Sequence, residues 1–471
     1  MEVLEICSGK TNYKNICFDF VFDNQSLRLI PPEDKKQEVE KWGMKRLASG
    51  TYTIGEPITM DNPYLTGILN ETGQTIIFMM KQGDIIGFRN SVLFVEVKAF
   101  ILFSTKCKLM GRIAFSGPEI NGIHPVGQAF SITSDRKMKN DGIISIQTTD
   151  YDKTITQKSL FYVDEKKVSI HFSIGRKIRL SIQDTPLQLT SIMAFEFEPT
   201  NDYEFIYKLY IIAKQFIQYL CYRKNIIIDC IELSELIEDE KYNICGQMKI
   251  VGSSIQCEVK PIKEKRYIKQ KYIEGFEGKL LSDIATGRIY LRHLPETNES
   301  GRNIDAARFI MIMAAFEWEF RRIFPEGIKK KKATLIAEDN AIRQLQVLVD
   351  SSSGKLREIY KYLKKQIVSS SLSNKIIFVG KKLGDTIDLF GTQLYHLNDE
   401  ELNYSAMGER LSRQRNNYAH GNLDKEFEGL ALLDLVYLEL VLYAMQLKYY
   451  GVEDIKIKKS INELFHKSFS I

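Results

Sequence analysis

The first 200 residues alternate between hydrophobic and polar positions over short stretches. The stretches are rich in Ile, Phe and Val and cover residues 15–22, 75–79, 91–103, 143–147, 168–172 and 177–182. Successive side chains of a β-strand point to opposite faces, so this alternation predicts half-buried antiparallel strands. Gly, Pro, Asn and Asp separate the stretches, as expected for turns. We therefore expect a β-rich N-terminal domain, built as a sandwich or as barrel-like sheets.

One helix interrupts this pattern after residue 202. Its apolar residues recur every three or four positions, at Phe205, Leu209, Ile212, Phe216 and Leu220. Strand patterns resume at 226–231 and 248–251, so the helix is embedded in the β-rich part. A polar stretch ends at residues 294–301. We place the domain boundary there, which divides the chain into residues 1–295 and 296–471.

The second part of the chain is helical throughout. Helices are expected over residues 304–324, 338–349, 355–368, 376–390, 401–419 and 427–449, and Gly380 and Gly384 are expected to interrupt the fourth of them. Asn303 is the expected N-cap of the first helix, in which Glu317 and Arg321 are spaced for an ion pair. The last helix is apolar nearly all round and should be deeply buried. The fold class is therefore α+β and multidomain, with a β-rich part followed by an all-α helical bundle.

Composition limits the function without choosing it. The 471 residues include 44% hydrophobic and 27% charged residues, and the net charge is +5. This mildly basic balance permits a nucleic-acid partner but does not require one. The seven cysteines contain no CxxC pair, so reduced thiols are expected, with no metal site and no cofactor. The chain begins without a signal-peptide pattern, and its longest apolar stretch, 430–445, includes Asp434 and Glu439. We expect a cytoplasmic protein with no membrane partner.

A short motif between the last two expected helices carries the candidate chemistry. It reads Arg415-Asn416-Asn417-Tyr418-Ala419-His420. RNA cleavage without a metal needs a base, an acid and a cation that stabilises the phosphate. Histidine, with a pKa near about 6.5, can act as base or acid, and the arginine fork matches phosphate oxygens. Arg415 and His420 are therefore the candidate catalytic residues, and Asn416 is a candidate for orienting either the phosphate or the histidine.

Helix geometry adds a condition. Positions five apart on an α-helix differ by about 140° around its axis, so Arg415 and His420 would not reach one atom from a continuous helix. Gly421 is the expected residue that ends the helix in a left-handed turn, which leaves His420 at the helix edge. One histidine per chain cannot easily act as base and acid in the same step. We therefore expect a homodimer, or a higher oligomer, in which two chains share one site.

Further basic residues are candidates for contacting the substrate. Four consecutive lysines, Lys329, Lys330, Lys331 and Lys332, follow the first helix, and Arg413 precedes the motif. Such residues neutralise phosphates in nucleic-acid complexes. A lysine run is also typical of a solvated loop, and both interpretations of the run stay open.

The motif resembles the signature of the HEPN superfamily, helical domains many of which are metal-independent RNases. The whole layout is similar to the ApeA-like family of bacterial anti-phage proteins, which pair a β-rich N-terminal domain with a C-terminal HEPN domain. The similarity is carried by the Arg-Asn-x-x-Ala-His form of residues 415–420 and by the helical segment 314–320. It implies an endoribonuclease that halts growth upon infection, with RNA, above all tRNA, as substrate. The front domain is larger than a dimerising helical nuclease needs, so we expect it to sense infection or to restrain the nuclease, with a phage protein as a candidate trigger.

A second interpretation remains. An Arg-x4-His spacing also occurs by chance, and HEPN domains include inert members. The alternative is a non-catalytic HEPN module that binds a nucleotide or a protein in a defence or toxin–antitoxin system. Growth arrest that depends on His420 would separate the two.

Overall fold

The computed structural model divides the chain into two compact units. It describes residues 6–23, 26–54, 62–81, 87–89, 91–107, 109–134, 144–178, 187–238, 240–252, 258–328, 332–368, 371–422 and 427–471. The β unit comprises residues 1–221, 225–262 and 269–286. The helical unit comprises residues 222–224, 263–268 and 287–471. The division nearest to the boundary expected at residue 295 thus falls between residues 286 and 287.

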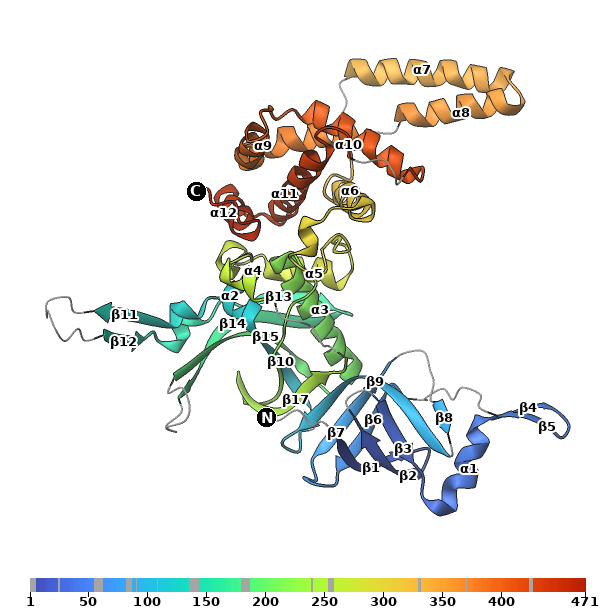
Figure 1. Cartoon of the computed structure of the whole chain (residues 1–471), viewed down its shortest axis with the longest axis vertical. Helices are drawn as coiled ribbons and strands as arrows, with labels where there is room; N and C mark the ends of the chain where they lie inside the picture. Colours follow the sequence, from blue (N-terminus) through green and yellow to red (C-terminus); the bar gives the residue numbers. More distant parts are fainter. Residues whose placement is uncertain are drawn as a thin grey trace. The chain divides into compact units, whose positions relative to one another are not determined.

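The first part of the β unit is a closed six-stranded barrel (Figure 1). In spatial order its strands are β9 (Val92–Phe103), β3 (Ser26–Ile30), β2 (Ile16–Phe22), β1 (Cys7–Tyr13), β6 (Tyr64–Leu69) and β7 (Thr75–Met80). All neighbours are antiparallel. β9 is long enough to close the ring, because its first half pairs with β3 and its second half with β7.

Aromatic side chains fill the barrel. Phe18, Phe20 and Phe22 alternate along β2 with exposed or half-buried residues, and each is almost fully buried. The rings of Phe20 and Phe22 both meet Phe78 edge to face, at 5.2 Å between centroids. This arrangement is favourable for aromatic pairs. The buried positions are those that the alternation predicted for this strand.

The sheet continues beyond the barrel through the pairing of β17 with β9. The further strands are, in spatial order, β17 (Lys241–Ile250), β16 (Cys230–Glu238), β10 (Met110–Ser116), β15 (Leu187–Thr200), β14 (Lys166–Ile178) and β13 (Ser159–Val163). Shorter strands are β4 (Met44–Ala48), β5 (Thr51–Ile54), β8 (Gly87–Arg89), β11 (Phe130–Ser134) and β12 (Ile144–Thr148). The strand expected over 226–231 was wrong for its first four residues. There the backbone N–H of Ile227 bonds to the Glu119 side chain instead of to a strand partner.

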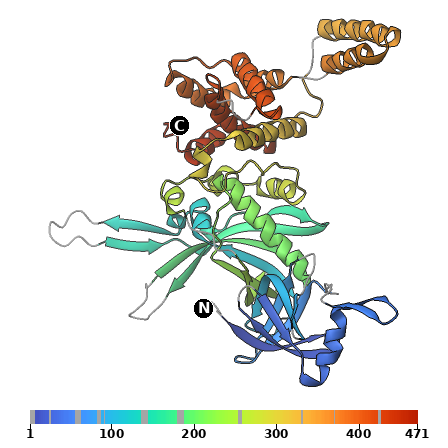
Figure 2. The same ribbon diagram turned by 45° about the vertical axis from the view of Figure 1, so that its right-hand side comes forward.

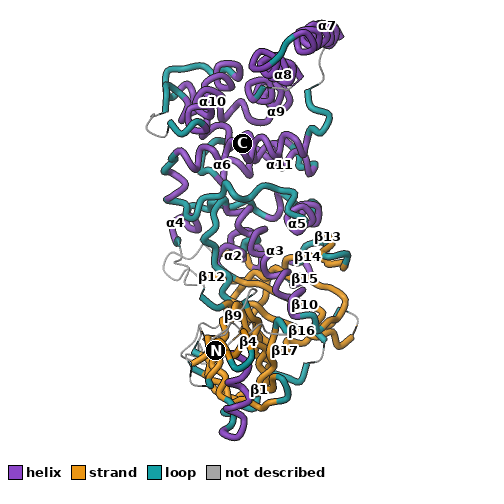
Figure 3. The backbone as a smooth tube through the Cα atoms, turned by 90° about the vertical axis from the view of Figure 1, so that its right-hand side faces the viewer, coloured by secondary structure: helices purple, strands orange, loops and turns teal. Residues whose placement is uncertain are grey.

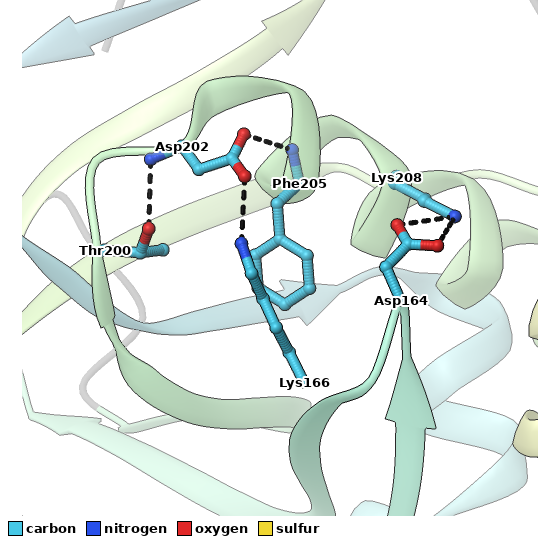
Figure 4. Close-up of polar contacts among 6 residues, drawn as sticks. All are labelled: Asp164, Lys166, Thr200, Asp202, Phe205 and Lys208. Atoms are coloured by element: carbon cyan, nitrogen blue, oxygen red, sulfur yellow. Dashed lines mark hydrogen bonds and ion pairs between the residues drawn. The ribbon is translucent and has the colours of Figure 1, made fainter.

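The embedded helix is α3 (Tyr203–Cys221), and its start is tied to β14. The Asp202 carboxylate accepts from the backbone N–H of Phe205 at 3.0 Å and from Lys166 Nζ at 2.9 Å (Figure 4). Lys208, on the first turns of α3, pairs with Asp164 at 2.5 Å. An aspartate at the N-cap satisfies a backbone donor that the helix leaves unpaired. The short helices of this part are α1 (Lys36–Glu40), α2 (Pro118–Ile123), α4 (Val259–Lys263) and α5 (Glu277–Ala285).

The helical unit is built around one buried helix, α11. Figure 3 distinguishes its helices from the strands of the β unit. They are α6 (Ala306–Ile323), α7 (Lys332–Ser351), α8 (Gly354–Val368), α9 (Leu372–His396), α10 (Tyr404–Ala419), α11 (Ala431–Tyr450) and α12 (Asp454–Leu464). α11 packs against α6, α9, α10 and α12, and it is buried nearly all round, as its composition predicted. The predicted α+β class, a β-rich part followed by helices, is confirmed.

Two details of the helices differ from the sequence prediction. The N-cap of α6 is Asp305, whose carboxylate accepts from the backbone N–H of Arg308 at 2.7 Å, so the assignment to Asn303 was wrong. α9 runs without interruption through Gly380. A Cβ at Gly380 would lie 2.6 Å from the ring of Tyr404, so the glycine allows α10 to approach α9 closely. Within the described residues, every helix falls short of the length or the apolarity that a bilayer-spanning segment requires.

Candidate functional site

The motif lies on the last turns of α10, which three other helices hold in place. α10 packs against α6, α9 and α11, and Figure 2 gives a second view of this group. At its start, the side chain of Asn403 accepts from the backbone N–H groups of Ser405 and Ala406. Near its end, the buried ring of Tyr418 meets Phe309 of α6 edge to face, at 5.4 Å. Both ends of α10 are therefore fixed by specific contacts.

The end of α10 has the geometry that the sequence predicted. Gly421 has a φ of +81°, in the left-handed region. Its N–H bonds to the carbonyl of Tyr418 at 3.1 Å, and the N–H of Asn422 bonds to the carbonyl of Asn417 at 3.1 Å. This pair of bonds is a Schellman motif, which satisfies carbonyls that the helix leaves free. His420 is the C-cap residue and its side chain is exposed to solvent.

Arg415 faces the neighbouring helices. Its Nη1 donates to Glu317 Oε1 of α6 at 3.0 Å. Lys375 Nζ of α9 lies 3.4 Å from the same oxygen. One carboxylate therefore holds two cations that come from two different helices. The Arg415 side chain remains 37% exposed, so part of its fork is accessible from solvent.

A different face of α10 carries the other candidate residues. Arg413, Asn416 and His420 are spaced by three and four positions, which places them on one side of the helix. All three are exposed. The backbone N–H of His420 still bonds to the carbonyl of Asn416 at 3.1 Å, so the helical pattern reaches the histidine. Arg415 and His420 therefore leave α10 in directions about 140° apart. A single copy of α10 does not direct both side chains at one phosphate.

The described basic residues that were predicted to contact a substrate, Arg413 and Lys332, lie on different helices. Arg413 shares the exposed face of α10 with His420. Lys332 is the exposed first residue of α7, a helix that packs against α8. Lys329, Lys330 and Lys331 lie outside the described residues. Contact of the lysine run with a substrate stays a prediction.

A second arginine of α10 has a different environment. Arg410 donates to both carboxylate oxygens of Asp434 on α11, through Nε and Nη2, each at 2.7 Å. The Asp434 side chain is fully buried and also accepts from the Tyr395 hydroxyl at 2.5 Å. Burial, followed by the nearby Asp434 carboxylate, raises the pKa of Tyr395 well above its ordinary value. The tyrosine therefore stays protonated and donates this bond. This network connects α9, α10 and α11, so the role of Arg410 is structural.

Sequence reasoning did not connect Glu317 or Lys375 with the motif. It assigned Glu317 to a pair with Arg321 on the same helix, because the i,i+4 spacing was the only relation visible. The structure shows the Glu317 carboxylate bonded across helices, to partners that lie far away in sequence. The segment that contains Glu317 was noted only for its likeness to a family. No spacing rule links it to Arg415.

Among the described residues of the β unit, a charged surface forms an open concavity of about 950 Å³ beside α3. Four lysines line it: Lys81, Lys98, Lys166 and Lys208. Each of the four pairs with a carboxylate, at distances of 2.5 to 2.9 Å. The positive charge is therefore balanced locally, and we assign no ligand to this concavity.

The described residues offer no metal site, and known proteins offer no relative that would help to assign the candidate site. In the part of the chain that the structure describes, no group of three or more His, Cys, Asp or Glu side chains is placed to hold a metal ion. Compared with models of protein families, with curated proteins and with solved structures, the chain matches none.

Proposed function

We propose that the protein is a metal-independent endoribonuclease whose active site is shared by two chains. The observation that carries the proposal is the placement of the motif at the end of α10. His420 is exposed beside a Schellman turn, and Arg415 is partly exposed on another side of the same helix. Two copies that face each other would supply the histidines and arginines that one copy does not direct at one point.

The proposed reaction follows from these side chains. One His420 takes the proton from the ribose 2′-OH, and this oxygen attacks the adjacent phosphorus. The bond from phosphorus to the 5′-oxygen breaks, and the second His420 donates a proton to that oxygen. Arg415 stabilises the additional negative charge on the phosphate, and Asn416 donates a hydrogen bond to it. The products are a 2′,3′-cyclic phosphate and a 5′-hydroxyl end.

The proposed biological role rests on the resemblance to ApeA-like anti-phage proteins. In this role the enzyme cuts RNA, above all tRNA, when a phage infects the cell, and growth stops. The β unit restrains the nuclease or senses infection, with a phage protein as the candidate trigger. Its size supports this division of labour, because a dimerising helical nuclease does not need a six-stranded barrel and a further sheet.

A second candidate function is a non-catalytic module that binds a nucleotide or a protein. The contact that favours it is the pair between Arg415 and Glu317, since a carboxylate already occupies one side of the guanidinium. An arginine held in this way can support the fold or a binding surface without any reaction.

Sequencing of RNA ends after expression of the full chain tests the proposal. Wild type should produce new 5′-hydroxyl ends at defined positions and arrest growth, and His420→Ala should abolish both. His396→Ala is the matched control, because His396 also ends a helix and is exposed. New ends that persist in His420→Ala would place the active site elsewhere. If wild type produces no new ends but still binds RNA or nucleotide, the second function holds.

A further inference from the structure

Helices α7 and α8 form an antiparallel pair, here called the hairpin. Residues 352 and 353 join them, and Gly354 takes a left-handed φ of +59° at the turn. Figures 1 and 2 show the two helices side by side. Among the described residues, the extensive helix contacts of α7 and α8 are with each other. The hairpin therefore buries only the surface between its own two helices.

The hairpin leaves many large hydrophobic side chains in solvent. Eight of them are 41% to 66% exposed: Leu335, Ile336, Val347, Leu348, Leu356, Ile359, Tyr362 and Leu363. Single exposed apolar residues are common on soluble proteins, but a cluster of this size marks an interaction surface.

Helical geometry places part of this cluster on one side of the hairpin. At about 100° per residue, one flank of α7 carries apolar residues next to the surface that contacts α8. α8 carries a similar flank. Because the helices are antiparallel, both flanks turn to the same side of the pair. The residues concerned, called the hairpin face, are Ala337, Ala341 and Leu348 of α7 with Leu356, Ile359 and Leu363 of α8.

The opposite side of the hairpin is mainly polar, with Ile336 and Val347 at its outer edge. Lys364 Nζ donates to Gln346 Oε1 at 2.6 Å across the two helices. Asp339 and Arg343 on α7, and Arg357 on α8, lie on the same side by the same helical geometry. A helix pair with one apolar and one polar face is half of a four-helix bundle, which lacks only its second layer.

We propose that the hairpin of a second copy of this chain covers the hairpin face, so that two chains form a four-helix bundle. A two-fold axis parallel to the helices places α8 of each chain over α7 of the other. Such an axis brings together residues at the same height along the helices, so Leu356 and Ile359 of one chain meet Leu348 of the other near the turn, and Leu363 lies towards Ala341. The choice of a second copy rests on the proposed function, which requires two chains at one site.

The size of the face indicates the class of interface to which this contact belongs. The 15 residues of α8 span about 22 Å, and two helices side by side are about 20 Å wide. Covering such a face on two chains removes on the order of 1,000 Å² from water, at the lower end for specific interfaces. The hairpins therefore form a weak, reversible dimer that depends on protein concentration.

Sedimentation of the full-length chain over about 1 to 100 μM tests this proposal. Ile359→Glu places a charge in the hairpin face, and we expect its dimer dissociation constant to rise about 100-fold or more. Since Ile359 is 53% exposed, the new carboxylate can reach water in the monomer and the hairpin stays folded. Asn340→Glu is the matched control, because it adds the same charge on the side of α7 that faces away from α8. Leu348→Gln is a milder second variant, and far-ultraviolet circular dichroism checks the helix content of all three.

Dimerisation that is lost in Ile359→Glu and Leu348→Gln but kept in Asn340→Glu supports the proposal. Ile359→Glu chains that associate as tightly as wild type overturn it. A wild type that stays monomeric at every concentration also overturns it. RNA cleavage is measured on the same samples. A wild type that dimerises through the hairpin but cuts no RNA would refute the proposed function while the hairpin dimer stands.

Discussion

Substitution by alanine should have different effects on stability and activity at two arginines of α10, Arg415 and Arg410. Arg415→Ala removes a guanidinium that is 37% exposed and pairs with a carboxylate that is 27% exposed. Ion pairs of this exposure contribute about 0–1 kcal/mol to stability. Glu317 also keeps Lys375 as a partner after the substitution, so no charge is left unpaired. We expect the free energy of unfolding of Arg415→Ala to lie within about 1 kcal/mol of wild type.

Arg410→Ala is the matched control for stability. It removes both hydrogen bonds from Arg410 to Asp434, a carboxylate with no exposed side-chain surface. Leaving one partner of a buried pair without its counter-charge costs about 3–5 kcal/mol. Both substitutions exchange Arg for Ala on the same helix, so their effects on helix propensity are alike. The difference between their free energies of unfolding therefore reports the different environments of the two side chains.

The assay combines urea unfolding with RNA cleavage on the same preparations. Arg415→Ala should unfold near the wild-type midpoint and cleave RNA about 10²–10³ times more slowly, because in the proposed mechanism Arg415 is the cation that stabilises the phosphate. Arg410→Ala should unfold at a clearly lower urea concentration. Two results would refute the reasoning: an Arg415→Ala enzyme that cleaves at the wild-type rate, or one that is destabilised as strongly as Arg410→Ala.

Two further predictions concern the chemistry and the stability. In the proposed mechanism Arg415 and His420 supply the cation, base and acid, so cleavage should survive excess EDTA and leave 2′,3′-cyclic phosphate ends; a strict Mg²⁺ requirement with 3′-hydroxyl ends would contradict the mechanism. Burial, followed by the nearby Arg308, lowers the pKa of His293 to about 3. The unfolded chain therefore binds a proton that the folded chain does not, so this stability is present above pH ~6.5 and is lost as the pH falls towards 3. The unfolding free energy should drop by about 2 kcal/mol between pH 7.5 and pH 5 through this group, and urea titrations should show a smaller drop in His293→Gln.

Local hydrophobic patterns predicted correctly those helices and strands whose burial follows the periodicity of their own sequence. β2 and the first half of β9 bury alternate residues, and α11 is buried nearly all round, so the hydrophobic pattern of each sequence matches its burial. The same rules failed where the conformation of a residue depends on contacts with residues far away in the sequence. Gly380 was expected to disturb its helix, whereas the glycine makes room for Tyr404 of α10. Residues 226–228 are apolar like a strand, but the backbone N–H of Ile227 bonds to the Glu119 side chain of α2.

The same distinction applies to the candidate site. Gly421 predicted the end of α10, and with it the position of His420, because a Schellman turn involves only consecutive residues. The environment of Arg415 was not predictable in this way. Glu317 and Lys375 come from α6 and α9, and only tertiary packing brings them to one guanidinium. The sequence therefore identified candidate catalytic side chains, but not the carboxylate that holds one of them.

The path of the chain between the two units shows why a domain boundary predicted from sequence is unsuitable for truncating the protein. Tyr222 directly follows α3, yet it belongs to the helical unit. There its hydroxyl and Arg308 Nη2 both donate to Glu439 of α11, a carboxylate that is 8% exposed. Burial raises the pKa of Glu439, and these two donors offset part of that effect by stabilising its charged form. Residues 296–471 alone would lack the Tyr222 donor, although the charge stays buried. The helical unit is therefore completed by residues that lie, in sequence, within the predicted N-terminal domain.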